Sequence, residues 1–191
     1  MGKKKTFYNT FPTIVFWAAL ILSKKSLVPI IPFCAALFHE CGHLITMKLC
    51  GRKIETITLF PFGIDIRTRG EITSYKNDIL ICASGIFVNL ILALLCTFLP
   101  KNSYTELFFS SNVIFAIINS LPIKTLDGGE LVEKILYSKT NPYVTEKICS
   151  ALSFFAILIL GTIAIWVFFK SGYNFTLFFM CIYLFCKTFI K

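Results

Sequence analysis

Hydrophobic residues dominate this chain in long runs, and short polar stretches separate the runs. Six of them can be marked, and each has roughly the length of a membrane helix. They cover residues 7–22, 26–50, 79–99, 107–126, 148–169 and 173–190. A helix needs about 20 residues to cross the ~30 Å hydrocarbon core of a bilayer. The sequence therefore predicts an all-α membrane protein, a polytopic bundle of about six transmembrane helices.

The polar stretch at 51–71 has a different pattern. Residues 54–59 and 64–68 are rich in β-branched side chains and roughly alternate polar and apolar positions, and the turn-forming residues 61–63 separate them. This pattern predicts a short β-hairpin near the cytoplasmic face. An ordinary amphipathic loop fits the pattern about equally well, and it stays open as the alternative.

Composition and charge fit a membrane protein. Of the 191 residues 56% are hydrophobic, 15% are charged, and the mean hydropathy is +0.75. With six spans and a cytoplasmic N-terminus, 15 of the 19 lysines and arginines lie inside. The remaining four are Lys24, Lys25, Lys101 and Lys170. This bias predicts a multi-pass protein of the cell membrane with both termini in the cytoplasm. It also accounts for the net charge of +9 without a nucleic-acid partner.

The eight cysteines form no C-x-x-C pair, and nearly all of them lie in apolar runs. We therefore expect buried free thiols and no disulfide framework.

The two histidines of the chain stand four residues apart, in the string His39-Glu40-Cys41-Gly42-His43. On a helix, positions i and i+4 share a face, so both imidazoles can bind one metal ion. Glu40 points about 100° away from His39, within reach of a water on that metal. A pair of polar residues packed in a helix bundle is the alternative, which is disfavoured because ionisable groups are costly inside a membrane.

A catalytic zinc site has three protein ligands and one open position. Glu40 is the acidic residue within the apolar runs, and Asp127 directly follows one of them. His43 precedes Cys50 by seven residues and thus lies ~10 Å below the inner surface, and Asp127 follows the inner end of the 107–126 run, where Pro122 interrupts the helix. Asp127 could instead be a helix cap facing the cytosol, and taken alone it favours that alternative.

Three motifs together resemble the site-2 protease family of intramembrane zinc metalloproteases. They are HECGH at 39–43, SGIFVN at 84–89 and NSLPIKTLDGG at 119–129. The resemblance covers roughly residues 35–130. It implies one Zn²⁺ per chain, held by His39, His43 and Asp127. It also implies that Glu40 is the general acid/base and that Asn119 positions the substrate.

Two features depart from the family pattern. Ile86 stands where a proline is usual, and Lys124 and Thr125 occupy a stretch in which many members have a second proline. We expect Lys124 to be exposed in a loop and tolerant of substitution. These departures concern the fine geometry of the site and leave the ligands unchanged.

The span before HECGH and the string LFPFG at 59–63 are most similar to the sporulation branch, which processes a membrane-associated pro-sigma factor. We therefore expect a bacterial protease that cleaves a pro-sigma factor or another tethered regulator near the cytoplasmic face, with lipid and possible membrane-protein regulators as further partners. Residues 1–191 are interpreted as a single transmembrane metalloprotease domain without a soluble regulatory or PDZ domain. The alternatives are a membrane peptidase acting on non-membrane peptides and a catalytically inactive zinc-binding scaffold.

Overall fold

The computed structural model describes residues 28–60, 63–69, 74–172 and 175–190. The chain forms two compact units that divide between Ala116 and Ile117. The predicted first span at 7–22 lies outside the described residues.

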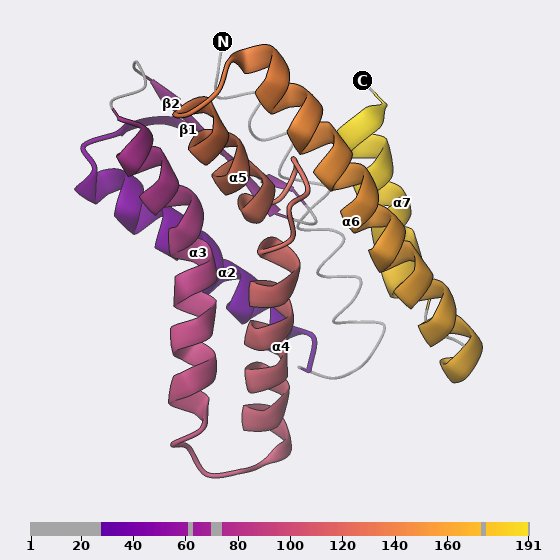
Figure 1. Cartoon of the computed structure of the whole chain (residues 1–191). Coiled ribbons are helices and arrows are strands. Elements are labelled where there is room, and N and C mark those ends of the chain that lie inside the picture. Colours follow the sequence, from indigo (N-terminus) through magenta and orange to yellow (C-terminus); the bar gives the residue numbers. More distant parts are fainter. Residues whose placement is uncertain (1–27, 61–62, 70–73, 173–174, 191) are drawn as a thin grey trace. The chain divides into compact units, whose positions relative to one another are not determined.

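The first unit contains helix α2 (Ile30–Leu49), strands β1 (Lys53–Phe60) and β2 (Gly63–Arg69), helix α3 (Tyr75–Cys96) and most of helix α4 (Ser103–Asn119). Helices α2 and α3 pack side by side (Figure 1). Strands β1 and β2 pair antiparallel, from Lys53 opposite Arg69 to Phe60 opposite Gly63, with an irregularity between Ile54 and Thr56. On which side of a membrane these strands lie stays a prediction.

Helices α2 and α3 approach each other through glycines. A Cβ atom at Gly42 of α2 would lie 2.8 Å from Val88 Cγ2 and 3.0 Å from the Ser84 carbonyl oxygen of α3. A Cβ atom at Gly85 of α3 would lie 2.8 Å from His39 Nε2. All three distances are shorter than van der Waals contact, so larger residues would push the helices apart. Small residues commonly mediate close helix contacts in membranes.

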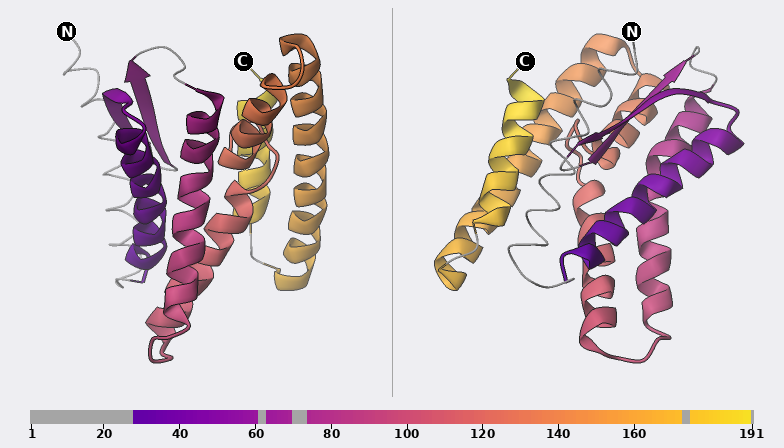
Figure 2. Two further views of the ribbon diagram at one scale, coloured as in Figure 1. Left: turned by 60° about the vertical axis from the view of Figure 1, so that its left-hand side comes forward. Right: turned by 180° about the vertical axis from the view of Figure 1, so that it is seen from behind.

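The second unit contains helices α5 (Asp127–Tyr137), α6 (Pro142–Ser171) and α7 (Thr176–Phe189). Helices α6 and α7 lie side by side, as both views of Figure 2 show. The core of this unit contains Ile123, Ile157 and Leu184. Asn141 caps α6 through a hydrogen bond of 2.9 Å from the Val144 N–H to its side-chain oxygen.

The apolar run at 107–126 is interrupted before its end, as Pro122 predicts. Helix α4 already ends at Asn119, and Asp127 begins the separate helix α5. Pro122 has no N–H to donate and its ring clashes with a preceding turn, so an irregular segment takes the place of the last helical turns. Helix α5 itself was not predicted from the sequence.

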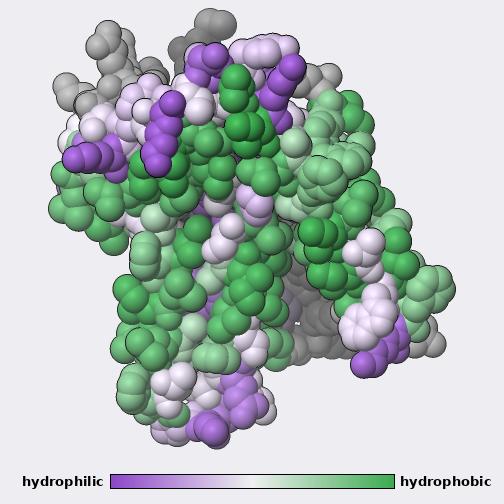
Figure 3. Space-filling view, viewed as in Figure 1, coloured by the Kyte–Doolittle hydropathy of each residue, from purple (hydrophilic) through white to green (hydrophobic). Residues whose placement is uncertain are grey.

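Three described helices, α2, α3 and α6, are long and apolar enough to cross a membrane. Helices α4 and α7, with 17 and 14 residues, are shorter. Large apolar side chains of α3, such as Phe87, Ile91 and Leu94, are exposed. Figure 3 shows apolar surface along α3 and α4 and polar surface at the loop that joins them. The protein is a multi-pass membrane protein, and the count of six spans stays a prediction.

All eight cysteines are free, as expected. Four of them are buried, namely Cys82, Cys96, Cys149 and Cys181, whereas Cys41 and Cys186 are exposed. The expectation of burial is therefore wrong for these last two, since each faces away from the packed side of its helix.

Candidate metal centre

His39 and His43 lie on the buried face of α2, as the helical spacing predicts. Their exposed fractions are 5% and 7%, and their Nε2 atoms are 3.2 Å apart. Cys41, two positions from each histidine, is exposed, and Glu40 is partly buried. The helix thus separates the two candidate ligands from the cysteine.

The ring of His43 is oriented by the backbone of α3. Its Nδ1 lies 2.8 Å from the carbonyl oxygen of Ile81, to which Ser84 Oγ also donates at 2.6 Å. A carbonyl oxygen only accepts hydrogen bonds, so Nδ1 of His43 carries the proton and donates. In the neutral ring with this tautomer, the Nε2 atom of His43 has the lone pair.

The ring of His39 is oriented by Asn89 of α3. Its Nδ1 lies 2.6 Å from Asn89 Oδ1, and the Asn89 side chain is completely buried. The same reasoning places the proton of His39 on Nδ1, since Asn89 offers its oxygen there.

The two Nε2 atoms therefore lie 3.2 Å apart in the same buried place, and each Nδ1 faces an oxygen, which is the arrangement of two metal-binding histidines. In such sites the second ring nitrogen donates to a carbonyl or side-chain oxygen, which fixes the tautomer. Gly85 keeps the space beside the two rings open, because a Cβ atom there would lie 2.8 Å from His39 Nε2. The histidine pair fits zinc, which accepts imidazole ligands.

Asn119 and Asp127 belong to the second unit. Asn119 is the last residue of α4, Asp127 is the first residue of α5, and both are partly buried. The N-cap of α5 is Leu126, whose carbonyl accepts from the N–H groups of Gly129 and Glu130. Asp127 thus lies in the first turn, where the partial positive charge of the helix favours a carboxylate. The role of Asp127 as the third ligand stays a prediction.

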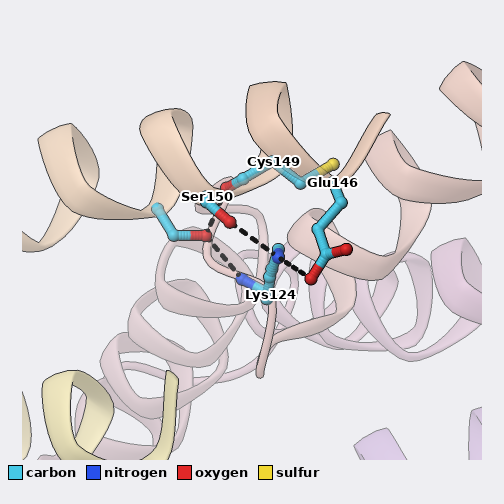
Figure 4. A network of polar contacts seen from close by, with 5 residues as sticks. Lys124, Glu146, Cys149 and Ser150 are labelled. Carbon is cyan, nitrogen blue, oxygen red and sulfur yellow. Dashed lines mark hydrogen bonds and ion pairs between the residues drawn. The ribbon is translucent and has the colours of Figure 1, made fainter. Parts of the chain in front are cut away.

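The segment between Asn119 and Asp127 is tied to α6, as Figure 4 shows. The Lys124 side chain is 23% exposed, and its Nζ donates to Ser150 Oγ at 2.8 Å and lies 3.9 Å from Glu146 Oε1. The Lys124 N–H donates to Ser153 Oγ at 3.0 Å. The expectation of a freely exposed Lys124 is therefore wrong, because α6 packs against the loop.

Two features of the first unit were missed by sequence reasoning. Asn112 of α4 is completely buried and hydrogen-bonded to Asn89. Asp78, in the first turn of α3, is buried and forms an ion pair with Arg52, which follows α2. The sequence signal for the ion pair was a charged residue just after α2 and another at the start of α3. No such signal existed for Asn112, which lies in no motif.

A comparison with known protein families finds a match over the greater part of this chain. The family model described as Peptidase M50B-like matches residues 13–129, more than half of the chain. The chain belongs to the Peptidase M50B-like family. The assignment to the site-2 protease type of zinc metalloprotease, made above from three motifs, is confirmed at the level of the family.

Several curated proteins are similar to this chain in sequence. A zinc metalloprotease of Methanocaldococcus jannaschii is 27% identical over 144 residues, which are 71% of this chain and 40% of that protein. Stage IV sporulation protein FB of Bacillus subtilis is 29% identical over 114 residues, 56% of this chain and 39% of that protein. The putative zinc metalloprotease Rip3 of Mycobacterium tuberculosis is 26% identical over 152 residues, 74% and 37% of the two chains. The matched regions thus span less than half the length of these relatives.

A solved structure has the same fold. The site-2 protease from Methanocaldococcus jannaschii aligns with a TM-score of 0.64 at 22% identity, over 93% of this chain and 85% of that one. This likeness confirms the predicted helical membrane fold of the family.

Proposed function

We propose that this chain is an intramembrane zinc endopeptidase whose Zn²⁺ is held by His39, His43 and Asp127. The observation that carries the proposal is the buried histidine pair, in which both Nδ1 atoms face oxygen acceptors and the two Nε2 atoms lie 3.2 Å apart. Asp127 is supported as third ligand by the Leu-Asp-Gly motif and by a family match that extends to residue 129. Three protein ligands leave one position open, as in catalytic zinc sites.

Zinc supplies Lewis acidity, which activates water and polarises a peptide carbonyl. Glu40 stands between the two ligands in sequence and is turned from their face, so its carboxylate takes a proton from the attacking water. The same carboxyl group then protonates the departing amine. Asn119 donates its side-chain N–H to the carbonyl oxygen as negative charge develops there.

The substrate that we propose is a membrane-associated protein cleaved near the cytoplasmic face, with both termini of the protease in the cytoplasm. The charge distribution supports this orientation. A Bacillus subtilis relative named for stage IV of sporulation supports a bacterial cell membrane. The resemblance of the LFPFG string at 59–63 to the sporulation branch supports a pro-sigma factor or another tethered regulator as substrate. We further propose that residues 1–191 act as a single metalloprotease domain with its core motifs at 35–130. Membrane-protein regulators would act on this domain.

The experiment that tests this proposal is co-expression with candidate membrane-tethered transcription factors. We expect Glu40→Gln to abolish cleavage, with a loss near the upper end of the roughly 10²–10⁴-fold typical of a general acid/base. Its zinc content should equal that of the parent protein, because Glu40 is not a ligand. Cleavage by Glu40→Gln at the parent rate would refute the hydrolase and leave a zinc-binding scaffold as the function.

A further inference from the structure

A line of hydrogen bonds through two buried asparagines runs from His39 through α3 into α4, entirely within the first unit. His39 Nδ1 lies 2.6 Å from Asn89 Oδ1, and Asn89 Nδ2 donates to Asn112 Oδ1 at 2.8 Å. Asn112 Nδ2 in turn donates to the Phe108 carbonyl at 2.8 Å. Both asparagine side chains are completely buried. None of the three recognised motifs contains Asn112.

The Phe108 carbonyl at the end of this line determines which atom donates and which accepts in every bond. The Phe108 carbonyl only accepts, so Asn112 turns its amide nitrogen toward Phe108 and its oxygen toward Asn89. Asn89 must then present its nitrogen to Asn112, and it donates with the same nitrogen to the Ala35 carbonyl at 3.2 Å. The Asn89 oxygen is thereby left for His39. This oxygen accepts a hydrogen bond from Nδ1 of His39, which must therefore carry a proton. In the neutral ring Nε2 then has the lone pair.

We propose that Asn112 is a positioning residue for the metal centre. Acting through Asn89, it keeps His39 in the tautomer and orientation in which Nε2 can bind a divalent metal. This inference rests on the proposed zinc site. Without Asn112, only the Ala35 carbonyl would oppose a turn of the Asn89 amide that presents nitrogen to His39 and moves the ring proton to Nε2.

Buried asparagines can also serve only to join helices. The two roles predict different states of the His39 ring. A joining residue would weaken metal binding by loosening the contact of α3 with α4, and its loss would leave the His39 tautomer unchanged. The loss of a positioning residue changes that tautomer through Asn89. The tautomer therefore separates the two roles, and a double-mutant cycle tests whether Asn112 acts through Asn89.

The experiment measures the zinc dissociation constant of the full chain in detergent, by competition with a chelator. We expect Asn112→Leu to weaken zinc binding about 10- to 100-fold, as for other residues that orient a ligand. Asn89→Leu should weaken it at least as much, and adding Asn112→Leu to Asn89→Leu should have no further effect. Ser111→Ala is the matched control, because Ser111 is buried on the same turn and bonds only to the Leu107 carbonyl.

A second measurement reads the tautomer directly. The chain contains two histidines, so ¹⁵N-histidine labelling of the metal-free protein gives one set of ring signals for each. We expect both rings to be protonated at Nδ1, and Asn112→Leu to add Nε2-protonated signal for one ring only. If the leucine variant does not fold, Asn112→Ser replaces it, since serine can bond to the Phe108 carbonyl but is too short to reach Asn89.

Each result of these measurements either supports or overturns the positioning role of Asn112. Unchanged zinc affinity in Asn112→Leu, or a loss that adds in full to that of Asn89→Leu, would overturn the positioning role. The zinc site itself would stand in that case, provided that His39→Ala loses zinc. Undiminished zinc affinity in His39→Ala would instead overturn the proposed function.

Discussion

The two parts of the proposed zinc site are built in different ways. His39 and His43 stand on one uninterrupted helix, where the backbone fixes their spacing and the neighbouring α3 only has to orient the rings. Asn119 and Asp127 stand at the ends of two helices, α4 and α5, joined by the irregular segment 120–126. In the first part, helix packing determines the geometry. In the second part, hydrogen bonds that hold a loop determine it.

This difference predicts different sensitivities. A change in the close contact between α2 and α3 acts on both histidines at once. A change around the loop alters the position of Asp127 or Asn119 only as far as the remaining hydrogen bonds allow. The variants below compare the two parts, beginning with the largest expected effect.

The largest effect is expected from Gly85→Ala. The added methyl group would lie within 2.8 Å of His39 Nε2 and in contact with His43, on the side where both lone pairs are presented. We expect the purified variant to lack stoichiometric zinc and to show no cleavage. Gly161→Ala is the matched control, because no atom of the described residues lies within 4 Å of a Cβ added at Gly161 of α6. Stoichiometric zinc in Gly85→Ala would show that α2 and α3 can separate without loss of the site.

The next largest effect is expected at Asn119, which we propose contacts the substrate. We expect Asn119→Ala to reduce the cleavage rate about 10²–10³-fold, the range found when one oxyanion donor is removed. Zinc content should be unchanged, because the amide is not a ligand. The measurement is the cleaved fraction of a co-expressed substrate over time, with zinc analysed in the same preparation. Loss of zinc in this variant would place Asn119 among the groups that hold the metal site together.

The contrast also explains what the sequence could predict. The helix that carries HECGH and its buried face follow from local 3.6-residue periodicity, which any window of the chain contains. Helix α5 was missed because it starts with Asp127-Gly128-Gly129, and glycines disfavour helices. The structure explains why glycine occupies both positions. A Cβ at Gly128 would lie 2.7 Å from the Leu121 carbonyl oxygen, and one at Gly129 would lie 2.6 Å from the Lys124 nitrogen. Only glycine allows the preceding segment to pass that closely.

Partners distant in sequence account for the other misses. Asn112 and Asn89 are separated by 23 positions and lie on different helices. Lys124 and Ser150 are separated by 26 positions. Periodicity and motif spacing report which face of a helix is buried. They do not report which polar residue of another helix meets it, because that depends on how the helices pack.

A moderate effect is expected from Ser153→Ala. Ser153 of α6 is completely buried, and its Oγ accepts the Lys124 N–H at 3.0 Å. Its removal leaves a polar backbone group without this partner, which costs about 1–3 kcal/mol. We expect a lower unfolding temperature and a reduced cleavage rate, since the segment before Asp127 loses an anchor. Thr162→Val is the control, because the Thr162 hydroxyl is exposed and bonds within its own helix. Equal stability losses in the two variants would show that the anchor is unimportant.

The smallest effect is expected from Lys124→Met, which keeps much of the apolar stem and removes the ammonium group. The variant therefore lacks the hydrogen bond from the ammonium group to Ser150. It also lacks the ion pair at 3.9 Å with Glu146, whose side chain is 72% exposed. Exposed ion pairs contribute about 0–1 kcal/mol, and salt screens them. The backbone N–H of residue 124 keeps its bond to Ser153, so we expect cleavage within about twofold of the parent and a small stability loss, within that range, at low salt. Glu146→Gln should reproduce the salt-dependent part. A large loss of activity in Lys124→Met alone would mean that the ammonium group itself, and not the backbone anchor, holds the loop in its active position.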